Sequence, residues 1–191
     1  MRKTALLTAM LTAFAMFALA PIFNLYAGTL ANVNLPDTVQ AGSTTLMLNG
    51  MGLRTKFMVK VCVAGLYLAQ KSSDPQAILK ADAPKRIVMH FVRDVSKNQL
   101  TDGFTESFEN NTPDAAKTLK PDIDRLFAAL ESVKDGDEIV FTYLPGTGTS
   151  LAIAGKDKLT IAAPAFSEML FSVWLGPKPP NAALKKGILE Q

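Results

Sequence analysis

The sequence holds few side chains of the types that carry out chemistry, and one arginine stands out by its position. Arg54 lies between a glycine-rich stretch, residues 49–52, and a long apolar run over residues 57–69 that only Lys60 interrupts. A guanidinium presents five fixed N–H donors, and its attraction for an anionic oxygen grows where water is excluded. The alternative is a solvated charge at a strand end, the usual fate of an arginine.

The other reactive side chains are expected to have structural roles. His90 is the single histidine and has no second metal-type ligand at useful spacing, so we expect no metal site. Cys62 is the single cysteine, cannot form an internal disulfide, and has the character of a small buried hydrophobe. No GxSxG elbow, close Cys–His pair or phosphate loop is present, and the Gly-Met-Gly and Gly-Thr-Gly stretches look like hairpin turns. We expect no cofactor.

The N-terminus has the pattern of a secretory signal peptide. Two basic residues, Arg2 and Lys3, precede an apolar stretch and then small residues, which places the signal at 1–27 with cleavage anywhere from 20 to 31. An uncleaved anchor over residues 4–23 is the rival. Nothing beyond residue 35 is apolar over a sufficient length to span a bilayer. We therefore expect a periplasmic or otherwise exported protein.

Length and charge limit the class of protein further. The chain has 191 residues, of which 48% are hydrophobic, which suits one medium domain with a sizeable core. Loss of Arg2 and Lys3 lowers the formal charge from +3 to +1 (3 − 2). That balance argues against nucleic acid as a partner, because such proteins normally carry a concentrated basic face. The oligomeric state is not fixed by the sequence.

Periodicity and turn signals predict the elements of the domain. Residues 28–43 form a leader that we expect to be extended and loosely held, and the domain spans 44–191. Glycines in residues 49–52 are read as a turn that makes residues 44–68 a hairpin-like pair, with a central strand buried on both faces over residues 57–69. Further strands are expected at 85–95, 139–144, 150–154 and 159–162. Helices are expected at 73–84, 96–111 (capped by Ser96), 120–133 and 164–176, and again near the end of the chain. Strands and helices in this order predict an α+β domain with an antiparallel sheet and helices on one face.

Three segments together resemble the chalcone isomerase-like family, in its secreted bacterial branch. They are LNGMGLRTKFMVKVCVAGLYL, YLPGTG and FSEMLFSVWLGPKPPNAALKKGIL, and the resemblance in element order covers residues 45–189. It implies an open-faced β-sandwich, in which an apolar ligand cleft separates a large antiparallel sheet from a helical layer. In the plant enzymes an arginine matching Arg54 holds the oxygen of a chalcone. Fatty-acid-binding members pair that arginine with a tyrosine on the long strand, and Tyr67 suits this role. The enzymes' tyrosine on the following helix has no counterpart near Ser96 or Gly103, although Ser172 matches a late hydroxyl.

Three hypotheses follow from these observations. The leading one is a non-catalytic binder of a fatty acid or similar amphipathic anion, or of a polyphenol-like molecule, held by Arg54 and Tyr67. The second is an isomerase of the chalcone isomerase type, an intramolecular lyase, in which Arg54 is the catalytic residue that stabilises enolate charge. The third is a structural or partner-binding module whose cleft is filled by side chains.

Overall fold

The computed structural model describes residues 26–190, so the expected signal peptide lies almost entirely outside the described residues. Seven strands form one antiparallel sheet in which each strand pairs with its neighbours in chain order. They are β3 (Thr38–Ala41), β4 (Thr44–Lys56), β5 (Val59–Leu68), β6 (Lys85–Phe91), β7 (Glu138–Leu144), β8 (Gly148–Ile153) and β9 (Lys156–Ile161).

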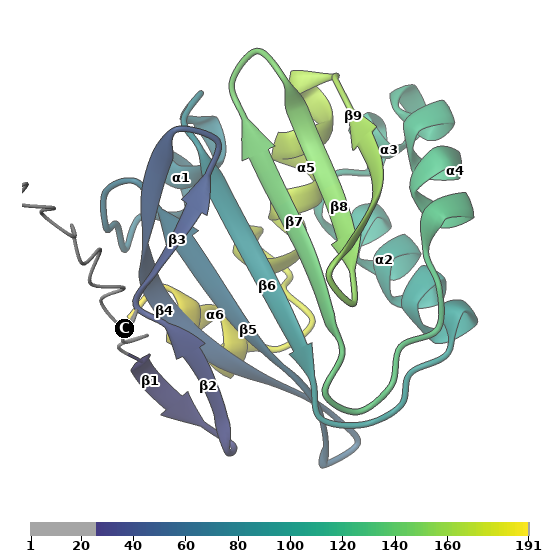
Figure 1. The fold of residues 1–191 in the computed structure, drawn as a ribbon. Coiled ribbons are helices and arrows are strands. Elements are labelled where there is room, and N and C mark those ends of the chain that lie inside the picture. The colour runs from purple at the N-terminus through teal and green to yellow at the C-terminus, as the bar shows by residue number, and fades with distance from the viewer. Residues whose placement is uncertain (1–25, 191) are drawn as a thin grey trace, which may run out of the picture.

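The helices gather on one face of this sheet, with α5 running behind β6 to β8 (Figure 1). They are α1 (Pro75–Lys80), α2 (Lys97–Asn111), α3 (Pro113–Thr118), α4 (Lys120–Ala129), α5 (Pro164–Leu175) and α6 (Ala182–Ile188). The sequence-based expectation of an α+β, open-faced β-sandwich is therefore confirmed. Helix α3 was not expected, because the Asn-Asn-Thr-Pro stretch that ends α2 also supplies the proline that begins the next helix.

Alternation along the strands builds two apolar layers. On β5, Cys62, Ala64 and Leu66 belong to the main core under the helices, whereas Val63 and Tyr67 belong to a smaller core on the opposite face. Strand β5 is buried from residue 61 to residue 68, as expected for a central strand.

The leader is more firmly held than the sequence indicated. Strands β1 (Tyr26–Leu30) and β2 (Val33–Pro36) pair with each other, and β3 forms one edge of the main sheet. Val33 and Leu35 are buried in the smaller core, where a Cβ on Gly65 would lie 2.3 Å from Leu35. The expectation of a loosely held leader is wrong, because the apolar side chains of the leader cover the face of the sheet opposite the helices.

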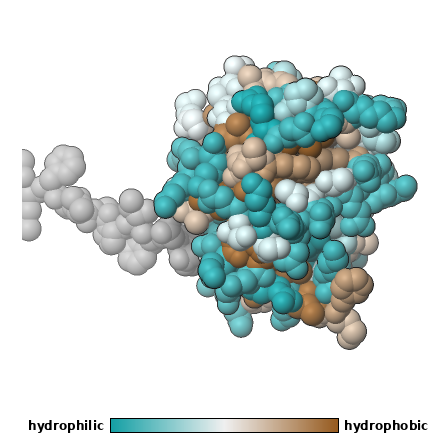
Figure 2. Space-filling view, turned by 90° about the vertical axis from the view of Figure 1, so that its right-hand side faces the viewer, coloured by the Kyte–Doolittle hydropathy of each residue, from teal (hydrophilic) through white to brown (hydrophobic). Residues whose placement is uncertain are grey.

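Polar side chains cover most of the face that carries α4, but apolar ones project at the lower edge of the molecule (Figure 2). Figure 1 places the β4–β5 turn at this edge. The exposed large hydrophobic residues of the described chain are Met47, Phe57, Met58 and Val59, three of which belong to this turn. No helix within residues 26–190 has the length and apolarity that crossing a bilayer requires.

Candidate functional site

The glycine-rich stretch before Arg54 lies in the middle of a strand and is not a turn. A Cβ on Gly50 would lie 2.3 Å from the Gly187 carbonyl oxygen, and one on Gly52 would lie 2.2 Å from the Leu184 carbonyl oxygen. These glycines let the backbone of α6 rest directly on β4. The predicted turn is therefore wrong: β4 continues to Lys56, and the chain reverses at residues 57 and 58.

Arg54 follows these glycines near the end of β4. It pairs with Cys62 in the register of β4 and β5, and the ladder shifts between Arg54 and Thr55, leaving Val61 without a partner on β4. Such a bulge redirects the side chains around it. Cross-strand partners share a face, so Arg54 lies on the side of Cys62 and of the helices. The Asn181 side chain, which caps α6, also donates to the Thr55 hydroxyl (3.0 Å).

A cavity of about 390 Å³ opens between this end of the sheet and helices α2 and α5. Its inner wall is apolar and buried, and the ring of Phe104 meets the ring of Trp174 edge to face with 6.2 Å between centroids. The volume lies within the range of about 300–1,000 Å³ that is usual for small-molecule sites. The buried apolar wall consists of Val61, Met89, Phe91, Val95, Leu100, Phe104, Val173 and Trp174.

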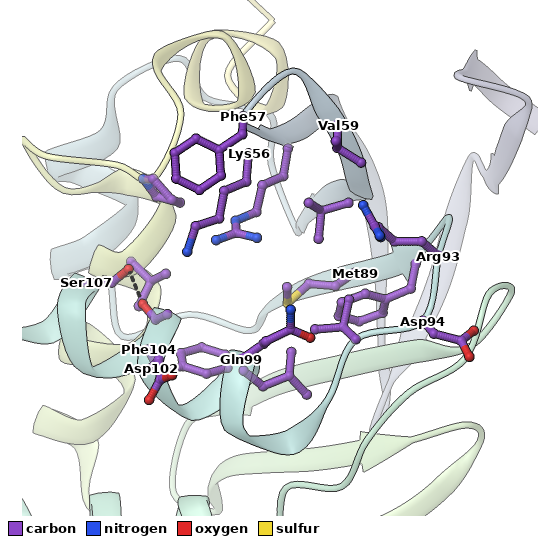
Figure 3. A pocket seen from close by; sticks show the side chains of 18 of the residues that line it. Lys56, Phe57, Val59, Met89, Arg93, Asp94, Gln99, Asp102, Phe104 and Ser107 are labelled. Atoms are coloured by element: carbon purple, nitrogen blue, oxygen red, sulfur yellow. Dashed lines mark hydrogen bonds between the residues drawn. The ribbon is translucent and has the colours of Figure 1, made fainter.

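The rim of the cavity carries three cations and two acids. Lys56 lies below Phe57 with its ammonium directed into the cavity, and Arg93 lies beside Val59 (Figure 3). The carboxylates of Asp94, next to Arg93, and of Asp102, on α2, point away from the cavity. The pKa of Asp94 is below its usual value, chiefly because the Asp135 backbone N–H donates to its carboxylate, with a further contribution from Lys134.

The Arg54 guanidinium is available for a ligand. Within residues 26–190 it has no hydrogen-bond or ion-pair acceptor, and it is half-buried. Gly103 of α2 faces it, since a Cβ there would lie 3.7 Å from Nη2 of Arg54. Any larger side chain at 103 would occupy the space beside the guanidinium. The arrangement leaves a cation beside an apolar wall, with room for an anionic group.

Two polar groups flank this space. The Gln99 side-chain oxygen accepts from the Ser96 backbone N–H (2.9 Å) and lies 3.1 Å from the Ser96 hydroxyl, which fixes the amide and leaves its NH₂ group toward the cavity. The Ser107 hydroxyl donates to the Gly103 carbonyl oxygen (2.8 Å; Figure 3). A second, more polar cavity of about 240 Å³ shares Arg54 and Lys56 with the first.

The structure does not bring Tyr67 together with Arg54. Tyr67 is fully buried on the opposite face of the sheet, where it pairs with Leu48 and its hydroxyl donates to the Pro36 carbonyl oxygen (2.9 Å). Burial raises its pKa well above the usual value. It lines neither cavity.

The remaining residues singled out in the sequence have structural contacts. His90 lies 3.1 Å from the Glu138 carboxylate. Ser172 donates to the Met169 carbonyl oxygen and lines neither cavity. Burial raises the pKa of Cys62 to about 12, against a smaller opposing effect of Arg54, so its thiol stays protonated. Among residues 26–190, no group of three or more metal-type side chains gathers in one place.

Sequence reasoning missed most of the rim. Lys56 lies two residues beyond Arg54, and alternation along a strand places such residues on one face, so it could have been found. Gln99 and Gly103 lie four residues apart and so share a face of α2. Arg93 and Asp94 were expected only at a strand exit, because nothing local indicates that this exit borders a cavity.

Comparison with known proteins agrees with this architecture. A family model described as chalcone isomerase-like matches residues 27–190. The crystal structure of a fatty-acid-binding protein of Arabidopsis thaliana is similar, with a TM-score of 0.64 and 16% sequence identity over 83% of this chain and 92% of that one. At this identity the likeness concerns the fold alone. No curated protein matches the chain in sequence.

Proposed function

The chain belongs to the chalcone isomerase-like family, and from that premise we propose that it binds a fatty acid or similar amphipathic anion. The carboxylate lies at Arg54 and Lys56, and the hydrocarbon tail lies along the apolar wall of the cavity. The observation that carries the proposal is the unpaired, half-buried guanidinium of Arg54 at the edge of a 390 Å³ apolar cavity.

Electrostatics supports an anionic head group. Three cations line the cavity, namely Arg54, Lys56 and Arg93, and the Asp94 carboxylate is already engaged by Lys134 and the Asp135 N–H. Arginine binds a carboxylate through two parallel N–H donors, and such charge-assisted bonds are stronger than neutral ones. The similar plant structure is that of a fatty-acid-binding protein, which is consistent with a ligand of this kind.

The isomerase alternative has weaker support. Arg54 could stabilise a developing enolate, but no tyrosine or histidine is among the cavity's lining residues. The hydroxyl of Ser172 donates to a backbone carbonyl and does not reach the cavity, and that of Ser107 donates to Gly103. The open cavity also argues against the third hypothesis, a module with a filled cleft.

Export remains part of the proposal. The basic and apolar N-terminus is the reason to expect cleavage between residues 20 and 31 and a periplasmic or similar location. The N-terminal residue of the protein isolated from a cell fraction outside the cytoplasmic membrane tests it. An intact Met1 in a membrane pellet would instead favour a retained anchor.

Native mass spectrometry with lipid extraction tests the binding function. The protein is purified without added lipid, beside an Arg54→Gln variant that removes the charge but keeps a polar side chain. A co-purifying fatty acid that is depleted in the variant supports the proposal. If neither protein carries or takes up an anionic lipid, and the wild type instead removes the enone absorbance of a chalcone, the isomerase hypothesis replaces it.

A further inference from the structure

The β4–β5 turn has a composition that its conformation does not favour. Phe57 and Met58 occupy its two central positions with φ values of +49° and +65°, and Lys56 pairs with Val59 across it. Two-residue turns of this kind favour Asn-Gly, because left-handed backbone is strained for bulky side chains. Other residues at positions 57 and 58 would make the turn more stable. The presence of Phe57 and Met58 therefore indicates a role other than folding.

Both central side chains are directed to solvent. Phe57 is 89% exposed, Met58 is 98% exposed and Val59 is 44% exposed. Apolar side chains project at the lower edge of the molecule in Figure 2, the edge at which Figure 1 places the β4–β5 turn. We call residues 56–60 the hairpin tip. Neighbouring apolar residues on a protruding turn indicate an interaction surface rather than chance exposure.

The charged residues of the tip itself are both lysines. Lys56 and Lys60 flank the apolar residues directly, and within residues 26–190 neither takes part in an ion pair with an acid. Arg93 lies next to Val59, whereas the carboxylates of Asp94 and Asp102 point away from the cavity (Figure 3). Apolar side chains ringed by lysine and arginine complement a bilayer whose surface is anionic and whose interior is hydrocarbon.

The tip also borders the candidate site. Phe57 and Val59 line the mouth of the 390 Å³ cavity, while Met58 and Lys60 line neither cavity. We propose that the hairpin tip docks onto the surface of an anionic phospholipid bilayer, with Phe57 and Met58 inserted among the lipids and the cavity mouth beside the membrane. Transfer of a fatty acid between bilayer and cavity then needs no passage through water, and this last step alone rests on the proposed function.

A fluorescent label tests the insertion directly. Met58→Cys carries an environment-sensitive fluorophore at the tip, and Met47→Cys carries the same label at an exposed methionine away from the tip. The native Cys62 is fully buried and stays unlabelled. With phosphatidylglycerol-containing vesicles, the Met58→Cys label should shift to the blue and be quenched by lipids bearing nitroxides in their chains. No shift at Met58→Cys, or equal shifts at both positions, would overturn the proposal.

Binding of the protein to vesicles tests the charges and the apolar tip separately. Lys60→Gln should reduce affinity for phosphatidylglycerol-containing vesicles at least threefold, whereas Lys117→Gln, an equal change of charge on α3, should leave it unchanged. The affinity of the double variant Phe57→Asn/Met58→Gly for these vesicles should fall at least tenfold. Its melting temperature should stay level or rise, because Asn-Gly suits the turn. Unchanged affinity in that double variant would contradict docking by the tip.

Dodecanoate binding without vesicles separates this proposal from the function proposed above. Lys60→Gln should bind dodecanoate as the wild type does, because Lys60 does not line the cavity. If the tip inserts into vesicles but the protein binds no dodecanoate, the docking proposal stands and the proposed ligand is wrong. One that binds dodecanoate but neither inserts nor binds vesicles would refute the docking alone.

Discussion

Arg54 on β4 and Gly103 on α2 face each other across the cavity, so that a Cβ on Gly103 would lie 3.7 Å from Nη2 of the guanidinium. The glycine leaves open the space in which the proposed carboxylate lies. One helix and one strand, far apart in the sequence, thus define the polar end of an otherwise apolar site.

Because of this closeness, a carboxylate introduced at position 103 can take the place of the ligand's carboxylate. Gly103→Glu places a carboxylate beside Arg54, where it should occupy the guanidinium and lower affinity for dodecanoate at least tenfold. Gly103→Gln is the matched control, with the same shape and no charge, and should lose clearly less. Both variants replace a helical glycine with a better helix former, so neither should melt earlier than the wild type. Equal losses in the two, measured by titration calorimetry, would show that bulk rather than charge matters.

The contact of α6 with β4 makes a prediction about stability. Gly52→Ala puts a Cβ 2.2 Å from the Leu184 carbonyl oxygen, a backbone atom that cannot rotate away. The helix must shift, which should lower the free energy of unfolding by about 1–3 kcal/mol or more. Gly103→Ala, whose Cβ would have an ordinary contact, should not destabilise. Urea denaturation of the two variants measures the difference, and similar midpoints would refute the close approach of α6.

Much of this fold could be predicted from the sequence, and the errors have identifiable physical causes. Glycine suits both a turn and a close backbone approach, and only the position of α6 distinguishes the two at Gly50 and Gly52. Ser96 was correctly predicted as a helix cap because a capping box is local, with Gln99 completing it.

The candidate site was harder to predict because it depends on which side of the sheet a residue faces. Arg54 is the cross-strand partner of Cys62 and faces the helices, whereas Tyr67 pairs with Leu48 and faces the smaller core. On β5, residues 62 and 67 differ by an odd number, so they lie on opposite faces. The pair Arg54 and Tyr67 came from the resemblance to fatty-acid-binding proteins, and the alternation of side chains along β5 was not applied to it.

The buried thiol predicts a dependence of stability on pH. The pKa of Cys62 is raised by burial from its ordinary value of 9.0 to about 12. An unfolded chain therefore loses this proton from about pH 9, while the folded chain keeps it. The resulting contribution to stability is complete below pH 9 and declines toward pH 12, by up to about 1.4 kcal/mol per pH unit.

Comparison with Cys62→Ala isolates this contribution. The free energy of unfolding of the wild type should fall more steeply above pH 9 than that of the variant, although the variant is less stable at neutral pH. Parallel curves for the two proteins would mean that the folded thiol ionises normally.

A buried lysine forms another structural contact outside the site. The ammonium of Lys85 donates to the carbonyl oxygens of Ile78 (2.9 Å) and Ala81 (2.8 Å) at the end of α1, and burial lowers its pKa. Lys85→Met keeps the aliphatic stem but leaves these carbonyls without a donor, which should lower the free energy of unfolding by about 1–3 kcal/mol. Lys117→Met, on the exposed face of α3, should change it little. If chemical denaturation finds no difference between the two variants, the hydrogen bonds of Lys85 do not stabilise α1.

The most direct test of the central claim compares dodecanoate with dodecanol in the wild type and in Arg54→Gln. If Arg54 is the anchor of an anionic head group, the wild type should prefer dodecanoate about 10–150-fold, the equivalent of a charge-assisted hydrogen bond of about 1.5–3 kcal/mol. Arg54→Gln should lose most of that preference while its affinity for dodecanol and its melting temperature stay close to those of the wild type. A wild type that binds both ligands equally, or a variant that keeps the full preference, would contradict the account.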